Sequence, residues 1–138
     1  MIAELKAMQT ALAPVGVPVH IGDATGAHPP FIVLWGSPGI GDRDETVSGP
    51  CGAWTAPCGV TCTGQDAEAA LTLAESVRGV LAPTMTPTAL AGVTGRHVVP
   101  ELTDARSVQV DRTVTLTSTN THPAFVVLLL DIHSAPTA

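Results

Sequence analysis

The segment CGAWTAPCGVTCTGQDAEAALTLAESVRGVLAP, residues 51–83, joins a strand pattern directly to a helix pattern. Between Trp54 and Cys62, apolar side chains alternate with threonine, proline and glycine, which is the period of a strand with one buried face. From Ala67 to Leu81, apolar residues recur at helical spacing, and Pro83 ends the pattern. The segment therefore predicts a strand that leads into an amphipathic helix near residues 65–82.

The predicted helix carries its own start signals and a stripe of small side chains. Thr63 or Gly64 is expected to cap the N-terminus, and Asp66 and Glu68 place negative charge in the first turn. A stripe rich in alanine allows a helix to pack closely on a sheet. The residues expected in this buried stripe are Ala67, Ala70, Leu71, Ala74, Val77 and Leu81.

All three cysteines of the chain lie in the same segment, at Cys51, Cys58 and Cys62. A structural zinc site usually needs two close pairs of ligands, but Cys58 and Cys62 form one loose pair, and the five histidines are scattered. The strand alternation places Cys58 and Cys62 on the apolar side, where free cysteine is common. We therefore expect structural thiols and neither a metal site nor a cofactor site.

The N-terminal third of the chain predicts one helix and two strands. Ile2, Leu5, Met8 and Leu12 recur at helical spacing, which indicates a short helix over residues 2–13. Strands are expected at residues 17–21 and 30–36. Residues 36–50 are rich in glycine and charge and predict a loop.

The C-terminal third predicts a connection and a strand pair. Residues 83–106 indicate a long connection, with a short strand possible at RHVVP, residues 96–100. Alternation in SVQVDRTVTLTST, residues 107–119, predicts a strand with one wet face. The nearly continuous apolar run THPAFVVLLLDIHS, residues 121–134, predicts a central strand buried on both faces. These last two strands are expected to form an antiparallel hairpin.

The length of 138 residues suits one domain. Together the expected elements predict a single-domain α+β fold, with a mainly antiparallel or mixed β-sheet and two helices packed on it. No basic start with an apolar block is readable at the N-terminus, and no apolar run approaches the ~20 residues of a membrane span, so we expect no membrane partner and synthesis in the cytoplasm.

Charge and motifs narrow the expected function. The formal net charge is −6, and the six basic residues are spread along the chain, whereas a nucleic-acid grip needs clustered Lys and Arg. Gly36 and Gly41 have the glycine spacing of a phosphate-binding loop, but Asp42 and Arg43 follow where Lys and Ser or Thr are required. No GxSxG hydrolase motif occurs. The sequence thus offers no catalytic motif, and we expect no enzyme activity.

The order of elements, and above all GVTCTGQDAEAALTLAESVRGVL (59–81) followed by HPAFVVLLLDIHS (122–134), resembles the tail terminator, or tail completion, proteins of long-tailed bacteriophages. The resemblance covers most of the chain and implies one tail-terminator-like domain over residues 1–138. It further implies a virion protein of the tail and neck, assembled in the host cytoplasm. Such proteins form a ring, usually of six subunits, that caps the tail tube and joins it to the head-side connector.

The resemblance also implies partners. These are further copies of the chain, the tail tube protein and a head-completion or connector protein, while DNA only passes through the bore. An acidic surface suits a channel wall that must not hold DNA. For contacts with partners we favour the long loops, because exposed irregular segments often carry recognition. The candidate contact residues are Asp42, Arg43, Asp44, Glu45, Arg96 and Arg106. The alternative interpretation of the 42–45 run is a solvated loop tip.

Two other functions remain open from the sequence. Another phage structural part, such as a head–tail connector or a tail tube subunit, would share the size, the acidity and the self-assembly. A small cytoplasmic enzyme would need a site brought together by folding, for example from Asp42, His97 and Cys62.

Overall fold

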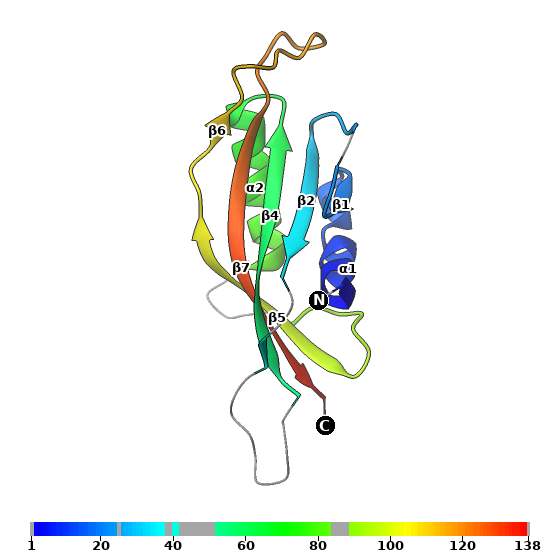
Figure 1. The fold of residues 1–138 in the computed structure, drawn as a ribbon. Helices are drawn as coiled ribbons and strands as arrows, with labels where there is room; N and C mark the ends of the chain where they lie inside the picture. Colours follow the sequence, from blue (N-terminus) through cyan, green and yellow to red (C-terminus); the bar gives the residue numbers. More distant parts are fainter. Residues whose placement is uncertain (1, 25, 38–39, 42–51, 84–88, 138) are drawn as a thin grey trace.

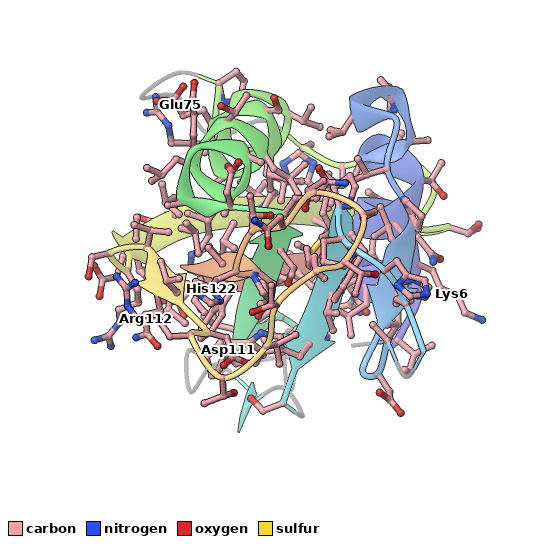
Figure 2. The ribbon with its side chains drawn as sticks, turned by 90° about the horizontal axis from the view of Figure 1, so that it is seen from above. Lys6, Glu75, Asp111, Arg112 and His122 are labelled. Carbon is pink, nitrogen blue, oxygen red and sulfur yellow. The ribbon has the colours of Figure 1, made fainter. Side chains whose placement is uncertain are left out.

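One mixed β-sheet carries two helices on one of its faces (Figure 1). The computed structural model describes residues 2–24, 26–37, 40–41, 52–83 and 89–137. The view from above shows that both helices lie on the same side of the sheet (Figure 2). The arrangement confirms the predicted α+β class. None of the described helices is long and apolar enough to cross a bilayer.

The sheet is built around two long central strands. Its strand order is β1-β2-β4-β7-β5, with β3 paired to β4 and β6 paired to β7. Only the β1–β2 pair is parallel among the described pairs. The strands are β1 (Val19–Ile21), β2 (Phe31–Gly36), β3 (Ile40–Gly41), β4 (Trp54–Gly64), β5 (Arg96–Ala105), β6 (Gln109–Val110) and β7 (Ala124–Pro136).

The β4–β7 ladder confirms the two-residue period predicted for residues 54–62. The antiparallel register runs from Trp54 opposite Ser134 to Gly64 opposite Ala124. Alternate side chains of both strands face the helices and are buried. From β4 and β7 the buried apolar residues are Ala56, Cys58, Val60, Cys62, Ala124, Val126, Leu128, Leu130 and Ile132.

The helices complete the core from one side. Helix α1 (Ile2–Ala11) is followed by the short 3₁₀ helix η1 (Ala13–Val15), in agreement with the predicted helix at residues 2–13. Helix α2 (Ala67–Leu81) packs mainly on β4 and β7. Its N-cap is Asp66, whose carboxylate accepts a hydrogen bond from the Ala69 N–H at 2.8 Å, so the predicted cap at Thr63 or Gly64 was wrong.

The buried stripe of α2 also differs from the predicted one. Leu71 is 46% exposed, and Leu73 is buried in its place. The packed face of the helix follows the spacing i, i+3, i+4, i+7 and i+11 from Ala70, which includes Leu73, Ala74, Val77 and Leu81 and turns Leu71 toward solvent. The alanines in this face bring the helix backbone close to the sheet.

Gly64, the last residue of β4, allows this close approach. A Cβ atom built on Gly64 would lie 2.4 Å from the Ala70 backbone nitrogen and 2.9 Å from the Ala70 Cα. Both are atoms of the α2 backbone, which cannot swing aside as a side chain can. Only glycine therefore fits where β4 passes under the first turn of α2.

Several predictions about strands needed correction, including the loop predicted over residues 36–50, which contains the two-residue strand β3 paired with β4. β5 extends from Arg96 to Ala105, well beyond the short strand expected at 96–100, and it tolerates Pro100 because it is an edge strand. The strand predicted over 107–119 was wrong, since only Gln109–Val110 pairs with β7. The expected antiparallel pairing with the last strand is present at this short β6 alone, because β7 already has β4 and β5 as neighbours.

The last strand is central, as predicted, but it is not buried on both faces. Buried and half-buried residues alternate along β7. The half-buried residues point away from the helices, where no other described layer covers the sheet. The apolar run is therefore a strand with one packed face and one partly open face, which is apolar from Phe125 to Leu129 and carries Asp131 and His133 beyond that point.

Candidate interaction surface

The helix-free side of the sheet presents three cross-strand rows, in which apolar side chains of β2 and β7 lie on either side of a threonine or glycine of β4. We call this surface the open face. Its rows are Phe31–Thr63–Phe125, Val33–Thr61–Val127 and Trp35–Gly59–Leu129, from β2, β4 and β7. Apart from Gly59, these residues remain half-buried or exposed although the strands that carry them form the centre of the sheet. An apolar surface on a sheet without a covering layer is typical of a contact site.

Trp35 lies flat across one end of the open face. Its ring occupies the space above Gly59, where an added Cβ would lie 2.0 Å from a ring atom. The indole N–H donates to the Thr61 hydroxyl at 3.1 Å, which fixes the ring while leaving the side chain 38% exposed. A large amphipathic ring held in this way has little conformational entropy left to lose on binding.

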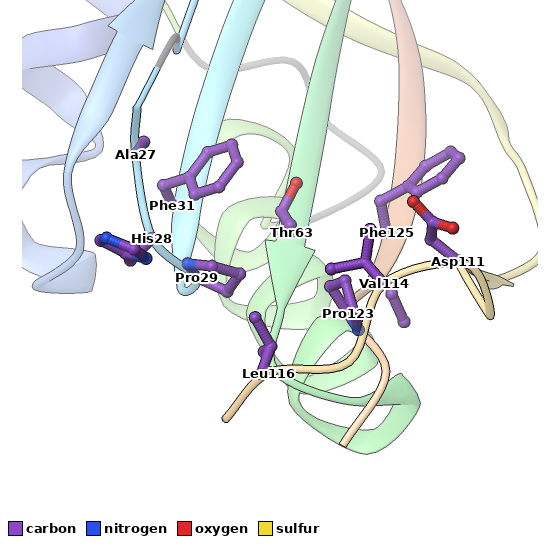
Figure 3. A pocket seen from close by; sticks show the side chains of 11 residues that line it. Ala27, His28, Pro29, Phe31, Thr63, Asp111, Val114, Leu116, Pro123 and Phe125 are labelled. Carbon is purple, nitrogen blue, oxygen red and sulfur yellow. The ribbon is translucent and has the colours of Figure 1, made fainter. Parts of the chain in front are cut away.

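At the other end of the open face the first row forms the floor of a pocket (Figure 3). We call it the end pocket, and its volume is about 430 Å³. Phe31 and Phe125 flank Thr63 on the floor, and the segment before β7 contributes Val114 and Leu116. Its remaining lining residues are Ala27, His28, Pro29, Asp111, Pro123 and Ala124. The lining is mostly apolar, with the His28 imidazole on one side and a carboxylate on the other (Figure 3).

Asp111 is this carboxylate, and two hydrogen bonds from Thr113 hold it in place. The Oδ1 atom accepts hydrogen bonds from the Thr113 hydroxyl at 2.6 Å and from the Thr113 N–H at 3.0 Å. These two bonds, with a smaller contribution from His122, lower the pKa of Asp111 below its ordinary value. The end pocket therefore combines aromatic walls with a fixed negative charge at neutral pH.

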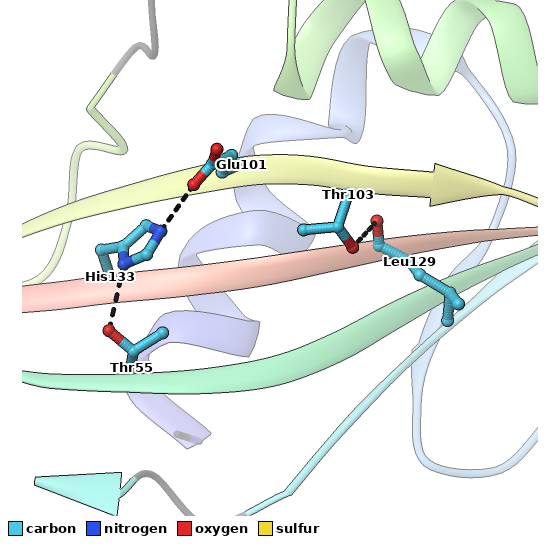
Figure 4. A network of polar contacts seen from close by, with 5 residues as sticks. All are labelled: Thr55, Glu101, Thr103, Leu129 and His133. Carbon is cyan, nitrogen blue, oxygen red and sulfur yellow. Dashed lines mark hydrogen bonds and ion pairs between the residues drawn. The ribbon is translucent and has the colours of Figure 1, made fainter.

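A polar row crosses β4, β7 and β5 near the opposite end of the sheet (Figure 4). The Thr55 hydroxyl lies 3.0 Å from His133 Nδ1, and His133 Nε2 lies 2.8 Å from the Glu101 carboxylate. Because a carboxylate only accepts, Nε2 carries a proton, and in the neutral ring Nδ1 accepts from the threonine. The order hydroxyl, imidazole and carboxylate is that of a nucleophile relay.

The surroundings favour a structural role for this row. His133 and Glu101 are 44% and 55% exposed on a sheet surface, and the backbone N–H groups of a sheet strand are used in its ladder. Acyl transfer also needs donors aimed at the developing oxyanion. The end pocket contains none of the three residues. We therefore interpret the row as a tie between three adjacent strands.

The candidate partner-contact residues proposed from the sequence differ in what the structure shows of them. Asp42, Arg43, Asp44 and Glu45 lie outside the described residues. Arg106 is exposed and pairs with Asp104 at 3.2 Å, a position open to partners. The proposal of partner contacts at Arg106 and at the 42–45 run stays a prediction.

Arg96 is held by its own chain. Its guanidinium donates to Ser134 Oγ at 2.6 Å, to the Ser134 carbonyl at 3.1 Å and to the Gly52 carbonyl at 2.8 Å. The guanidinium carbon also lies 5.9 Å from the centre of the Trp54 ring. These contacts join the ends of β4, β5 and β7, and contact of Arg96 with a partner stays a prediction.

The residues named for an enzyme site do not form one within the described chain. Cys62 faces the helices opposite Val126, whereas His97 is exposed opposite Ala135. Positions 126 and 135 differ by nine residues along β7, or roughly 30 Å of strand. Asp42 lies outside the described residues. Within the described part of the chain, no group of three or more His, Cys, Asp or Glu is placed to hold a metal ion.

Burial makes Cys58 and Cys62 unreactive thiols. Desolvation raises the pKa of each from 9.0 to about 12, and the charge of Asp131 adds to the effect at Cys58.

Alkylation by iodoacetamide at pH 8, in a Cys51→Ser background, is expected to be about a thousandfold slower in native protein than in denaturant, because three pKa units separate the thiolate fractions. Mass spectrometry follows both sites, and rapid labelling of native protein would contradict their burial.

The open face and the end pocket were not predicted from the sequence. The apolar continuity of residues 124–130 concealed the alternation that creates the open face. The end pocket depends on the segment between β6 and β7, which the sequence pattern assigned to a strand. A weak signal was present, because Phe31 and Phe125, the only two phenylalanines in the chain, both lie near strand starts.

Comparisons with known proteins identify no family for this chain. A scan against protein-family models and a search of curated proteins found no match.

Proposed function

We propose that this protein is a ring subunit that caps the tail tube of a long-tailed bacteriophage and joins it to the head-side connector. The observation that carries the proposal is the open face, an apolar sheet surface in a small acidic domain. A small domain with one packed face and one apolar open face is suited to assembly with other subunits. The resemblance of residues 59–81 and 122–134 to tail terminator proteins supports a tail terminator ring as that assembly.

Three further features support a structural role over a catalytic one. The Thr55–His133–Glu101 row lies outside the end pocket, Cys58 and Cys62 are buried thiols, and the described residues bring Cys62 and His97 to distant parts of the sheet. The net charge of −6 suits a wall past which DNA moves without binding. In this proposal the protein acts in the neck of the virion, with the tube protein and a connector protein as its neighbours.

A tube subunit or another connector protein is the second candidate, because an open apolar face serves those roles equally well. The position of the gene distinguishes them. A terminator gene is expected between the connector genes and the gene for the tube protein. Flanking genes of metabolic function, with no virion genes nearby, would contradict the proposal and would favour an enzyme.

A further inference from the structure

The described edges of the sheet are poor places for copies of this chain to join. β5 is an edge strand in which the Leu90 N–H already donates to the Val98 carbonyl at 2.7 Å. Pro100, two residues further on, lacks an N–H to offer at the same edge. A bulge between Leu102 and Asp104 distorts the rest of β5, and β1 has only three residues. Within the described part of the chain, side-chain surfaces are therefore better suited to contacts between copies than the sheet edges.

The end pocket is a side-chain surface that fits an occupant of a particular chemistry. Its aromatic and aliphatic walls need an apolar insert, and Val114 on its rim is itself 43% exposed. Asp111 keeps Oδ1 bonded to Thr113, while no described basic side chain forms an ion pair with it. An occupant that fits therefore presents an apolar side chain beside a cation.

The outer side of α1 presents this combination. Ile2 is 58% exposed, and Lys6 is exposed one helical turn later, so the two side chains lie on the same face of the helix. No described acidic residue pairs with Lys6. Among the described residues, Ile2 and Val114 are two of the four large hydrophobic residues that remain exposed. Joining the two surfaces covers both.

We propose that the Ile2–Lys6 face of α1 docks into the end pocket of a second copy of this chain, with Ile2 against the phenylalanine walls and Lys6 beside Asp111. Lys6 and Asp111 lie on different sides of the molecule (Figure 2). Such a contact is heterologous: each subunit uses α1 toward one neighbour and the end pocket toward the other. It forms a closed ring when the rotation between subunits divides a full turn. The inference rests on the proposed function and names the contact that builds its ring.

Charge reversal tests the contact by sedimentation analysis of the purified full chain over a wide concentration range at low salt. Lys6→Glu and Asp111→Lys are each expected to weaken self-association at least tenfold. The double variant, which restores an opposite pair, is expected to recover most of the association. Arg78→Glu and Glu75→Lys are matched controls, because they change the same charges on exposed positions of α2 and should leave association unchanged.

Crosslinking tests the same contact by position, in a Cys51→Ser background that leaves only the buried Cys58 and Cys62. An Ile2→Cys variant mixed with a Val114→Cys variant is expected to give a crosslinked dimer with a short bismaleimide, and neither variant alone should do so. Circular dichroism checks that each variant is folded.

The outcomes separate this inference from the proposed function. The α1 contact would be overturned if neither charge reversal changed self-association. It would also be overturned if crosslinking were equal in mixed and single-variant samples. Both results would leave the ring proposal intact. A chain that stays monomeric at the highest concentration would also overturn the inference, whereas a ring templated by the tube end would remain possible. The proposed function is tested separately, by the position of the gene and by the appearance of phage particles made without the protein.

Discussion

Gly64→Ala is expected to lower the free energy of unfolding by about 3 kcal/mol or more, because the new methyl group would collide with the backbone of α2. The first turn of α2 would have to lift from β4, and this would also loosen the buried Ala70. Denaturant unfolding of the wild-type and variant proteins measures the effect as a shift in midpoint at constant slope.

Gly79→Ala is the matched control for this prediction. Gly79 lies within α2, and an added Cβ there meets nothing within 4 Å. Alanine is therefore expected to raise the free energy of unfolding by about 0.5–1 kcal/mol through helix propensity. If Gly64→Ala were as harmless as Gly79→Ala, the close packing of α2 on β4 would be contradicted.

Polar replacement of the alanines on the packed face of α2 is expected to cause the second large loss of stability. Ala70 is completely buried and Ala74 is 6% exposed, both against the sheet. Ala70→Gln or Ala74→Glu is expected to cost about 3–5 kcal/mol, since each change overfills a close contact and buries a polar or charged group without a partner. Thermal and denaturant unfolding measure both variants.

Leu71→Gln provides the comparison on the same helix. Leu71 is 46% exposed, so this change is expected to alter the free energy of unfolding by no more than about 0.5 kcal/mol. The sequence pattern placed Leu71 in the buried stripe, and the experiment therefore distinguishes that stripe from the observed one. Equal losses at positions 70 and 71 would place the packed face of α2 elsewhere.

The parts of the fold that the sequence predicted are those fixed by local periodicity. Alternation from Trp54 to Cys62 and helical spacing from Ala67 to Leu81 each describe one element that buries one face. These patterns survive in the structure because β4 and α2 pack on each other. The N-cap was misassigned by two or three residues, since Thr63, Gly64 and Asp66 all offer acceptable start chemistry and the packing selects Asp66.

The errors arose where tertiary contacts override the local pattern. Residues 107–119 alternate as a strand should. However, β5 already pairs with most of β7, so only Gln109 and Val110 pair with the remaining start of β7. The short strand predicted at residues 96–100 ended at Pro100, although a proline at a sheet edge leaves the strand free to continue. The candidate site was harder still, because the open face and the end pocket are assembled from β2, β4, β7 and the segment before β7.

Electron microscopy of phage particles made without this protein tests the central proposal most directly. A bacteriophage that carries the gene is grown with the gene disabled, and the particles are examined for heads, tails and their junctions. The proposal predicts filled heads without joined tails, together with tail tubes of abnormal and unregulated length, and complementation with the intact gene should restore normal particles. Tails of normal length attached to heads in the absence of the protein would contradict its role as a tail terminator.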